Sequence, residues 1–240
     1  MSDSATVSTI RVATGVRLAY RAAGDPAAPA VILLHALGED GSTWDTVTAA
    51  LAPEWRCLAP DLRGHGRSDW PGTYSLELMR DDVLAFAAAS GLDRPAGFTL
   101  VGHSMGAAVA YLVAEARPGL VRRMVLEDPL PPVRPAAPRP VPDRPAGPPA
   151  VDWDAVLALY RQRNDPDPAW WDGLTGITAP TLIVGGGGRS HMPQDKLAEM
   201  AGLIPDGKMI TIDSGHEVHA GRPDEFIAGT RAFLAGGGTR

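Results

Sequence analysis

Short runs of apolar residues alternate along the chain with longer stretches in which apolar positions recur at the period of a helix. The runs are almost continuous in apolar residues, which is typical of parallel strands covered on both faces. They occupy residues 31–35, 56–61, 98–103, 123–128, 181–186 and 209–213. The alternation predicts an α/β fold, with a mostly parallel sheet and helices on both of its sides.

Before residue 31, apolar and polar residues alternate on either side of Thr14 and Gly15, which indicates an antiparallel hairpin and brings the expected sheet to about eight strands. Helical patterns lie at 44–51, 75–89, 105–116, 194–203 and 224–234. Ser75 is expected to cap the second helix, because its hydroxyl can accept a hydrogen bond from a first-turn N–H. We expect residues 1–240 to form a single domain.

One insertion, at about 129–178, interrupts this rhythm. Residues 129–149 contain ten prolines, which exclude a helix interior and a central strand because proline lacks the N–H donor and fixes φ. An amphipathic helix is expected next, at 151–163. Two interpretations stay open: a proline-rich surface linker, or a short lid over the strand ends that lines a substrate pocket. Half of the six tryptophans, Trp153, Trp170 and Trp171, lie in this insertion, which supports the lid and makes them candidate residues of the substrate pocket.

Composition narrows the class of protein. With 45% hydrophobic and 21% charged residues, the chain is typical of a soluble globular protein. A net charge of -6 disfavours a nucleic-acid partner. No apolar run is long enough to span a membrane and the first residues do not resemble a secretory signal, so we expect a cytoplasmic protein. The glycine-rich C-terminal tail is expected to fray. The lone Cys57 excludes an internal disulfide and a cysteine-built zinc site.

Candidate chemistry centres on Gly102-His103-Ser104-Met105-Gly106, a G-x-S-x-G pattern between an apolar strand and a helix. A serine on such a sharp turn needs small neighbours two residues away on each side, because a Cβ there would collide with adjacent backbone. The N–H of Met105 would lie at a helix N-terminus and supply half of an oxyanion hole. The N–H of Leu37, in the loop after residues 31–35, is the expected second donor.

A serine hydroxyl needs a base, and His216 is the best of the six histidines because it follows the last strand and precedes the final helix. His219 is a weaker rival. A metal site built on these two histidines lacks a third ligand at a recognisable spacing, so we expect neither metal nor cofactor.

The base in turn needs a carboxylate. No acid follows the run at 181–186, whereas Glu127 and Asp128 stand together at the end of the run at 123–128. Adjacent strand residues face opposite ways, so only one of the two can reach His216. We choose Asp128 as the acid, with Glu127 as the alternative and Asp195 as a remote third.

These motifs, HALG, DLRGHGRS, GHSMG and SGHEVHAGRP, occur in the order seen in the α/β-hydrolase fold family, which the chain resembles over almost its whole length. The resemblance implies that Ser104 is the nucleophile, His216 the base, and Met105 and Leu37 the oxyanion donors. Asp128 matches the acid of those members, including bacterial esterases and thioesterases, that place it after the sixth strand. Ala36 departs from the family pattern, which has glycine there.

The sequence therefore predicts a serine hydrolase that cleaves small to medium carboxylic esters or thioesters through an acyl-enzyme, with a small-molecule acyl substrate and no cofactor. Hydrolysis of lactones or C–C bonds and cofactor-free perhydrolysis are alternatives on the same residues. A ligand-binding protein without catalysis is the alternative from another class. The sequence leaves the oligomeric state open.

Overall fold

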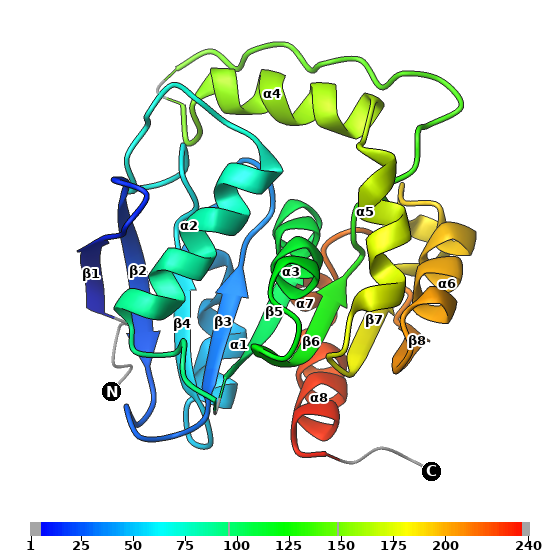
Figure 1. Ribbon diagram of the computed structural model, residues 1–240. Helices are drawn as coiled ribbons and strands as arrows, with labels where there is room; N and C mark the ends of the chain where they lie inside the picture. Colours follow the sequence, from blue (N-terminus) through cyan, green and yellow to red (C-terminus); the bar gives the residue numbers. More distant parts are fainter. Residues whose placement is uncertain (1–5, 96, 148, 237–240) are drawn as a thin grey trace.

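The computed structural model describes residues 6–95, 97–147 and 149–236, so the predicted frayed tail lies, from residue 237 on, outside the described residues. The described residues form one eight-stranded sheet (Figure 1). Its strands are β1 (Thr6–Arg11), β2 (Arg17–Ala23), β3 (Ala30–Leu34), β4 (Arg56–Pro60), β5 (Phe98–His103), β6 (Val121–Glu127), β7 (Thr181–Gly185) and β8 (Gly207–Thr211). The predicted number of strands is confirmed.

The strand order is β1-β2-β4-β3-β5-β6-β7-β8. The β1–β2 and β2–β4 pairs are antiparallel, and the pairs from β4 to β8 are parallel, as predicted. The last strand begins at Gly207, two residues before the predicted run, where Gly207 pairs with Thr181. This strand lies at the sheet edge and is mostly exposed, so its apolar residues are a poor guide to where it starts.

Helices cover both faces of the sheet. The α-helices are α1 (Asp45–Leu51), α2 (Leu76–Ala89), α3 (Met105–Ala116), α4 (Trp153–Asn164), α5 (Pro168–Gly173), α6 (Gln194–Leu203), α7 (Val218–Gly221) and α8 (Pro223–Leu234). The Ser75 cap of α2 is confirmed, since its hydroxyl accepts from the Leu78 N–H at 3.1 Å. The sequence patterns did not predict the short helices α5 and α7.

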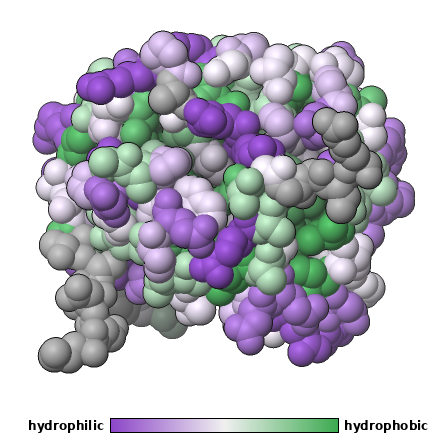
Figure 2. All heavy atoms as spheres, turned by 90° about the horizontal axis from the view of Figure 1, so that it is seen from below, coloured by the Kyte–Doolittle hydropathy of each residue, from purple (hydrophilic) through white to green (hydrophobic). Residues whose placement is uncertain are grey.

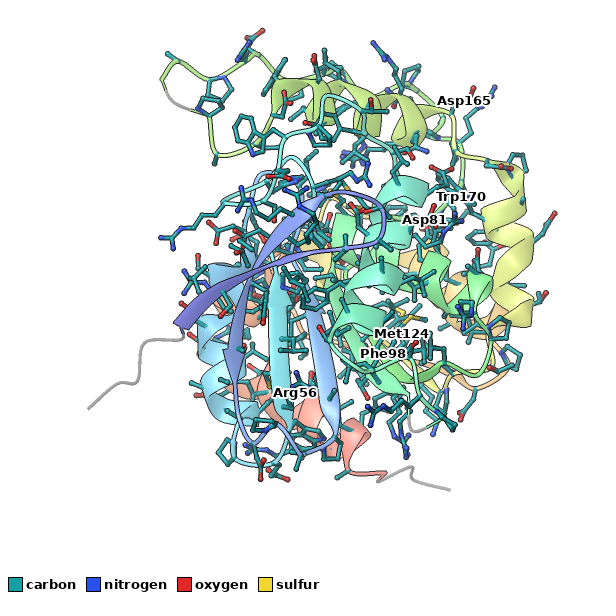
Figure 3. The ribbon with its side chains drawn as sticks, turned by 60° about the vertical axis from the view of Figure 1, so that its left-hand side comes forward. Arg56, Asp81, Phe98, Met124, Asp165 and Trp170 are labelled. Atoms are coloured by element: carbon teal, nitrogen blue, oxygen red, sulfur yellow. The ribbon has the colours of Figure 1, made fainter. Side chains whose placement is uncertain are left out.

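The strands bury side chains in two separate cores, one on each face. In β3, Ile32 and Leu34 join the core under α2, α3 and α6, whereas Val31 and Leu33 join the core under α1 and α8. Phe98 of β5 belongs to the first core, and Figure 3 shows it in the interior of the molecule. Burial on both faces explains why these strands read as continuous apolar runs.

The insertion lies over the carboxyl ends of the parallel strands, where α4 crosses the top of the molecule (Figure 1). The start of α4 is held by two hydrogen bonds. The Asp152 N–H donates to the Gly64 carbonyl at 2.7 Å, and the Tyr74 hydroxyl donates to the Asp152 carboxylate at 2.5 Å. The side chain of Asn164, at its end, bonds both backbone groups of Arg139. The proline-rich segment is thus attached to α4 and runs with it above the sheet.

The opposite face, at the amino ends of the strands, is mixed in polarity: Figure 2 shows hydrophilic groups with apolar patches between them. A cavity of about 720 Å³ opens here, lined by Arg56, Arg94 and Arg123 among others. Figure 3 places Arg56 at this end of the molecule. None of the described helices combines the length and apolar character that crossing a bilayer requires.

The helix α3 approaches β3 so closely that its first turn requires glycine. A Cβ on Gly106 would lie 2.1 Å from the Leu34 carbonyl oxygen, and one on Gly102 would lie 2.6 Å from the Gly106 carbonyl oxygen. The steric role predicted for both glycines is therefore confirmed. Backbone atoms cannot yield as a flexible side chain can, so a methyl group at Gly106 would push α3 away from the sheet.

We expect Gly106→Ala to lower the free energy of unfolding by about 2–3 kcal/mol, the cost of overpacking against backbone. Gly202→Ala in α6 is the matched control, because a Cβ there meets no atom within 4 Å. It should raise the free energy of unfolding by about 0.5–1 kcal/mol, since alanine favours the helix. Urea denaturation measures both. Equal midpoints for Gly106→Ala and the unaltered protein would contradict the close approach.

Candidate active site

Ser104 occupies the sharp turn between β5 and α3. Its backbone has φ 50° and ψ -107°, a left-handed conformation that costs a non-glycine residue about 1–3 kcal/mol. Two interactions hold it there: the Ser104 N–H donates to the Glu127 carbonyl at 3.0 Å, and the Ser104 carbonyl accepts from the Ala108 N–H at 3.1 Å. The serine is thus fixed between a neighbouring strand and the start of α3.

Asp128 directly follows β6 and is the other non-glycine residue with positive φ in the described part of the chain. Its buried carboxylate accepts hydrogen bonds from His216 Nδ1 at 2.6 Å, from the Gly186 N–H at 2.9 Å, from Gln194 Nε2 at 3.0 Å and from the Ser190 hydroxyl. Burial alone would raise the pKa of Asp128, but these hydrogen bonds together lower it below its usual value. Asp128 is therefore ionised at neutral pH and fixes the ring of His216.

Glu127 points to the other face of the sheet and contacts the other histidine. Its carboxylate accepts from the His219 backbone N–H at 2.8 Å and from His219 Nδ1 at 2.8 Å. The opposite ring nitrogen, His219 Nε2, lies 3.0 Å from the Thr43 hydroxyl. Both side chains of this pair are almost fully buried, next to Trp44. The geometry therefore favours Asp128 over Glu127 as the partner of His216.

His103 joins the two carboxylate–histidine pairs and was not recognised from the sequence as part of the site. Its Nε2–H donates to the His216 carbonyl at 2.9 Å, and its ring lies 4.7 Å from that of His216 and 5.2 Å from that of His219. Its Nδ1 lies 3.8 Å from the Glu39 carboxylate, an ion-pair distance beyond hydrogen-bond range. A histidine beside the serine was visible in the sequence, but its acidic neighbours were not.

The buried His103 is held in its charged form by these acids. Burial opposes protonation, but the negative charges of Glu127 and Glu39 outweigh it and raise the pKa of His103 to about 9. Burial likewise opposes ionisation of Glu39, whereas interaction with His103 lowers the pKa of Glu39 to about 2. The loop that carries His216 is thus bonded to a buried, charged imidazole.

The catalytic serine and base predicted from the sequence come from neighbouring parts of the site. Ser104 follows His103, whose ring is 4.7 Å from His216. No hydrogen bond joins the Ser104 hydroxyl to the His216 ring within residues 6–95, 97–147 and 149–236. In sites without substrate this contact is commonly long and tightens when substrate binds. The roles of Ser104, His216 and Asp128 stay predictions.

The two expected oxyanion donors lie beside the serine. Leu37 and Met105 line the same small cavity as Ser104, and neither backbone N–H donates a hydrogen bond to another described residue. The loop that carries Leu37 is braced by the buried ring of His35. His35 Nδ1 donates to the Ala36 carbonyl at 2.8 Å, and its Nε2 accepts from the Leu62 N–H at 2.9 Å.

The cavity beside Ser104 has a volume of about 50 Å³, and α4 forms part of its wall. Its apolar lining also includes Leu76, Leu130, Leu159 and Met192, and Tyr160 and Arg163 of α4 complete it.

The tryptophans expected around the pocket lie elsewhere. Trp170 points inward from α5 (Figure 3) and is buried in the core under α2, α3 and α6. Trp171 lies under the ammonium group of Lys196, 5.9 Å from it, and Trp153 packs against a small cluster around Tyr74. An aromatic residue count does not reveal which helix face a side chain occupies, so it gave the wrong pocket residues.

A metal site finds no support in the described residues, where no group of three or more His, Cys, Asp or Glu side chains could hold an ion. His216 and His219, the pair considered from the sequence, are each bonded to a different carboxylate.

Comparisons with known proteins agree with the observed fold. The profile of the Alpha/beta hydrolase family matches residues 31–229, which is most of the chain. A hydrolase from Pseudomonas aeruginosa has a similar structure, with a TM-score of 0.80 and 23% identity over 95% of this chain and 98% of that one. An enol-lactonase from Burkholderia xenovorans has a TM-score of 0.78 and 22% identity, over 95% of this chain and 100% of that one. At such identities the similarity extends to the fold alone.

Curated relatives share parts of the sequence. An uncharacterized protein of Mycobacterium tuberculosis is 38% identical over 117 residues, 48% of this chain and 33% of that protein. The aligned region thus spans about a third of the length of the first curated relatives. An sn-1-specific diacylglycerol lipase of Mus musculus is 26% identical over 258 residues, covering 88% of this chain and 83% of the lipase.

Substitutions of the two carboxylates are expected to have different effects, one on turnover and the other on stability. Asp128→Asn should lower kcat by about 10³–10⁴-fold, because an amide neither fixes the tautomer of His216 nor stabilises its cation. Glu127→Gln should lower the free energy of unfolding by about 1–3 kcal/mol, since it weakens a buried charged hydrogen bond, while kcat falls far less. Ester hydrolysis and urea denaturation measure the two effects. A larger loss of kcat in Glu127→Gln would reverse the assignment.

The charged His103 predicts a pH-dependent stability. Its pKa is about 9 in the folded protein and about 6.5 in the unfolded chain, so its contribution is complete below pH 6.5 and is lost as the pH rises through 9. We expect the free energy of unfolding to fall by about 2–3 kcal/mol over this range because the folded protein holds a proton that the unfolded chain has released. Denaturation of the unaltered protein and of His103→Gln at several pH values measures this term. Parallel stability curves would show that His103 is neutral.

Proposed function

Since the chain belongs to the Alpha/beta hydrolase family, we propose that it is a serine hydrolase that cleaves small to medium carboxylic esters or thioesters through an acyl-enzyme. The observation that carries this proposal is the juxtaposition of a strained serine with a buried carboxylate–histidine pair at the ends of neighbouring strands. Ser104 follows β5, and Asp128 follows β6 and bonds His216 at 2.6 Å. A hydrolase of this kind needs each of these groups.

In the proposed reaction, the Ser104 oxygen attacks the substrate carbonyl while His216 Nε2 takes the hydroxyl proton. Asp128 keeps the other proton on Nδ1, so that Nε2 is free to accept, and it stabilises the imidazolium that forms. The tetrahedral intermediate collapses, the C–O or C–S bond breaks, and His216 returns the proton to the leaving alkoxide or thiolate. A water molecule then attacks the acyl-enzyme by the same route and releases the acid.

The negative charge of the intermediate needs donors that are in place before the reaction. We assign this role to the backbone N–H groups of Met105 and Leu37, because both residues line the same cavity as Ser104. The Met105 N–H also lies at the N-terminal end of α3, where the helix dipole favours an anion. Removing one donor of this kind costs about 3–4 kcal/mol of transition-state stabilisation.

We further propose that the insertion serves as a cover for this site within a single-domain protein. Leu159 and Tyr160 of α4 line the cavity, so a substrate bound beside Ser104 would contact α4. The small size of the cavity, about 50 Å³, favours short acyl groups. Lactones are cyclic esters and could enter the same reaction, and an enol-lactonase shares the fold. A binding protein without catalysis would not need the strained serine together with the carboxylate–histidine pair.

Replacement of Ser104 tests the proposal. Ser104→Ala should lower the hydrolysis of 4-nitrophenyl acetate by about a thousandfold or more and abolish labelling by a fluorophosphonate probe, since the attacking oxygen is gone. Ser190→Ala is a useful comparison because the Ser190 hydroxyl donates to Asp128 and accepts from the Met192 N–H, but is not the proposed nucleophile. It should be labelled as the unaltered protein is, with a much smaller loss of kcat. Undiminished turnover or labelling in Ser104→Ala would refute the proposed function, and ligand binding without acyl-enzyme formation would favour the non-catalytic alternative.

A further inference from the structure

One wall of the cavity beside Ser104 is cationic. Arg163, on the last turn of α4, lines the cavity together with apolar side chains, and its guanidinium carbon lies 5.8 Å from the centre of the Tyr160 ring. Tyr160 lines the same cavity, so this contact holds the cation against the wall. Arginine stays charged at physiological pH. A charged side chain that lines an apolar pocket together with the nucleophile influences which substrate groups bind there.

Within residues 6–95, 97–147 and 149–236, no carboxylate pairs with Arg163. Nearby acids are engaged elsewhere. Asp165 pairs with Arg134 and lies at the outer end of α4 (Figure 3), and the Asp128 carboxylate is saturated by its four donors. A partly buried guanidinium without a carboxylate gains most from an anion that enters the pocket.

A second arginine, Arg139, adds positive charge near His191, at the edge of the site. Arg139 donates to the His191 carbonyl at 3.0 Å, and the His191 ring lies 4.3 Å from that of His216. Burial, and after it the nearby charge of Arg139, lowers the pKa of Arg163. Burial and the charges of His216, Arg163 and Arg139 lower the pKa of His191 to about 4, so His191 is neutral. Both arginines therefore lie near His191, and neither forms an ion pair with a carboxylate of the described residues.

We propose that the substrate carries a carboxylate group that pairs with Arg163, so that the site prefers acidic esters or thioesters over neutral ones of the same shape. This inference rests on the proposed function. A carboxylate fits the planar fork of a guanidinium, and the pair would form close to Ser104, where water is partly excluded. The apolar side chains that line the rest of the cavity would contact the short carbon chain between the carboxylate and the reacting carbonyl.

Two matched substrate pairs test the proposal, one for each side of the ester bond. Monoethyl succinate and ethyl 4-methylpentanoate differ only in a carboxylate or an isopropyl group on the acyl side. 4-Acetoxybenzoate and 4-isopropylphenyl acetate differ in the same way on the leaving-group side. For each pair, kcat/KM of the acidic ester is divided by that of the neutral ester, so that general effects of a variant cancel.

In Arg163→Gln we expect this ratio to fall roughly tenfold or more in at least one pair, the equivalent of one charge-assisted hydrogen bond. Arg163→Lys should keep part of the ratio because it keeps the charge. Arg161→Gln is the matched control, since Arg161 is an exposed arginine on the same helix turn, and it should keep the full ratio. An unaltered ratio for Arg163→Gln in both pairs overturns the proposal, whichever side of the ester carries the charge.

A binding measurement separates failure of this inference from failure of the proposed function. Succinate binding to Ser104→Ala by calorimetry requires no turnover. Adding Arg163→Gln should raise the Kd roughly tenfold. Equal affinity would overturn the carboxylate assignment even in a protein that hydrolyses neutral esters. Absence of ester hydrolysis and of fluorophosphonate labelling, with succinate binding that depends on Arg163, would instead refute the hydrolase and leave the carboxylate site.

Discussion

The buried carboxylate of Asp128 is the interaction on which the site depends. It accepts hydrogen bonds from the loop after β8, from the residue that follows β7 and from the first residue of α6, which are separate in the sequence. A buried anion is tolerated only where such donors surround it. The same donors that stabilise Asp128 therefore bring the ring of His216 to the carboxyl ends of β5 and β6. Without the Asp128 carboxylate, these three segments would lose the hydrogen-bond acceptor that they share.

The adjacent acids Glu127 and Asp128 organise two parallel pairs. Because strand residues alternate in direction, Glu127 reaches His219 in the core under α1 and α8, while Asp128, after the strand has ended, reaches His216 near the cavity. The charged His103 lies between them and bonds the backbone of His216. The buried Glu127–His219 pair and His103 thus lie next to the Asp128–His216 pair. His216 is held by hydrogen bonds both to its ring and to its backbone carbonyl.

The insertion contributes part of the lining of the cavity beside Ser104. Its proline-rich segment has no regular structure of its own, yet it is bonded to α4 through Asn164 and Arg139. The helix brings apolar groups and one guanidinium to a cavity whose remaining walls come from the loops of the sheet. The reacting groups and the groups that would select a substrate therefore come from different parts of the chain.

The sheet, most helices, the turn at Ser104 and the candidates His216 and Asp128 could be predicted from the residues alone, because burial periodicity and steric demands on glycine are local properties. The residues alone left Glu127 as an alternative to Asp128, since which carboxylate reaches His216 depends on where β6 ends and which loops surround it. The sequence missed the charge on His103, which arises from Glu39 and Glu127 across the sheet, and it placed three tryptophans at a pocket that they do not line. These contacts became visible only in the folded chain because electrostatic and packing partners are brought together by the fold, and no sequence spacing records their distance.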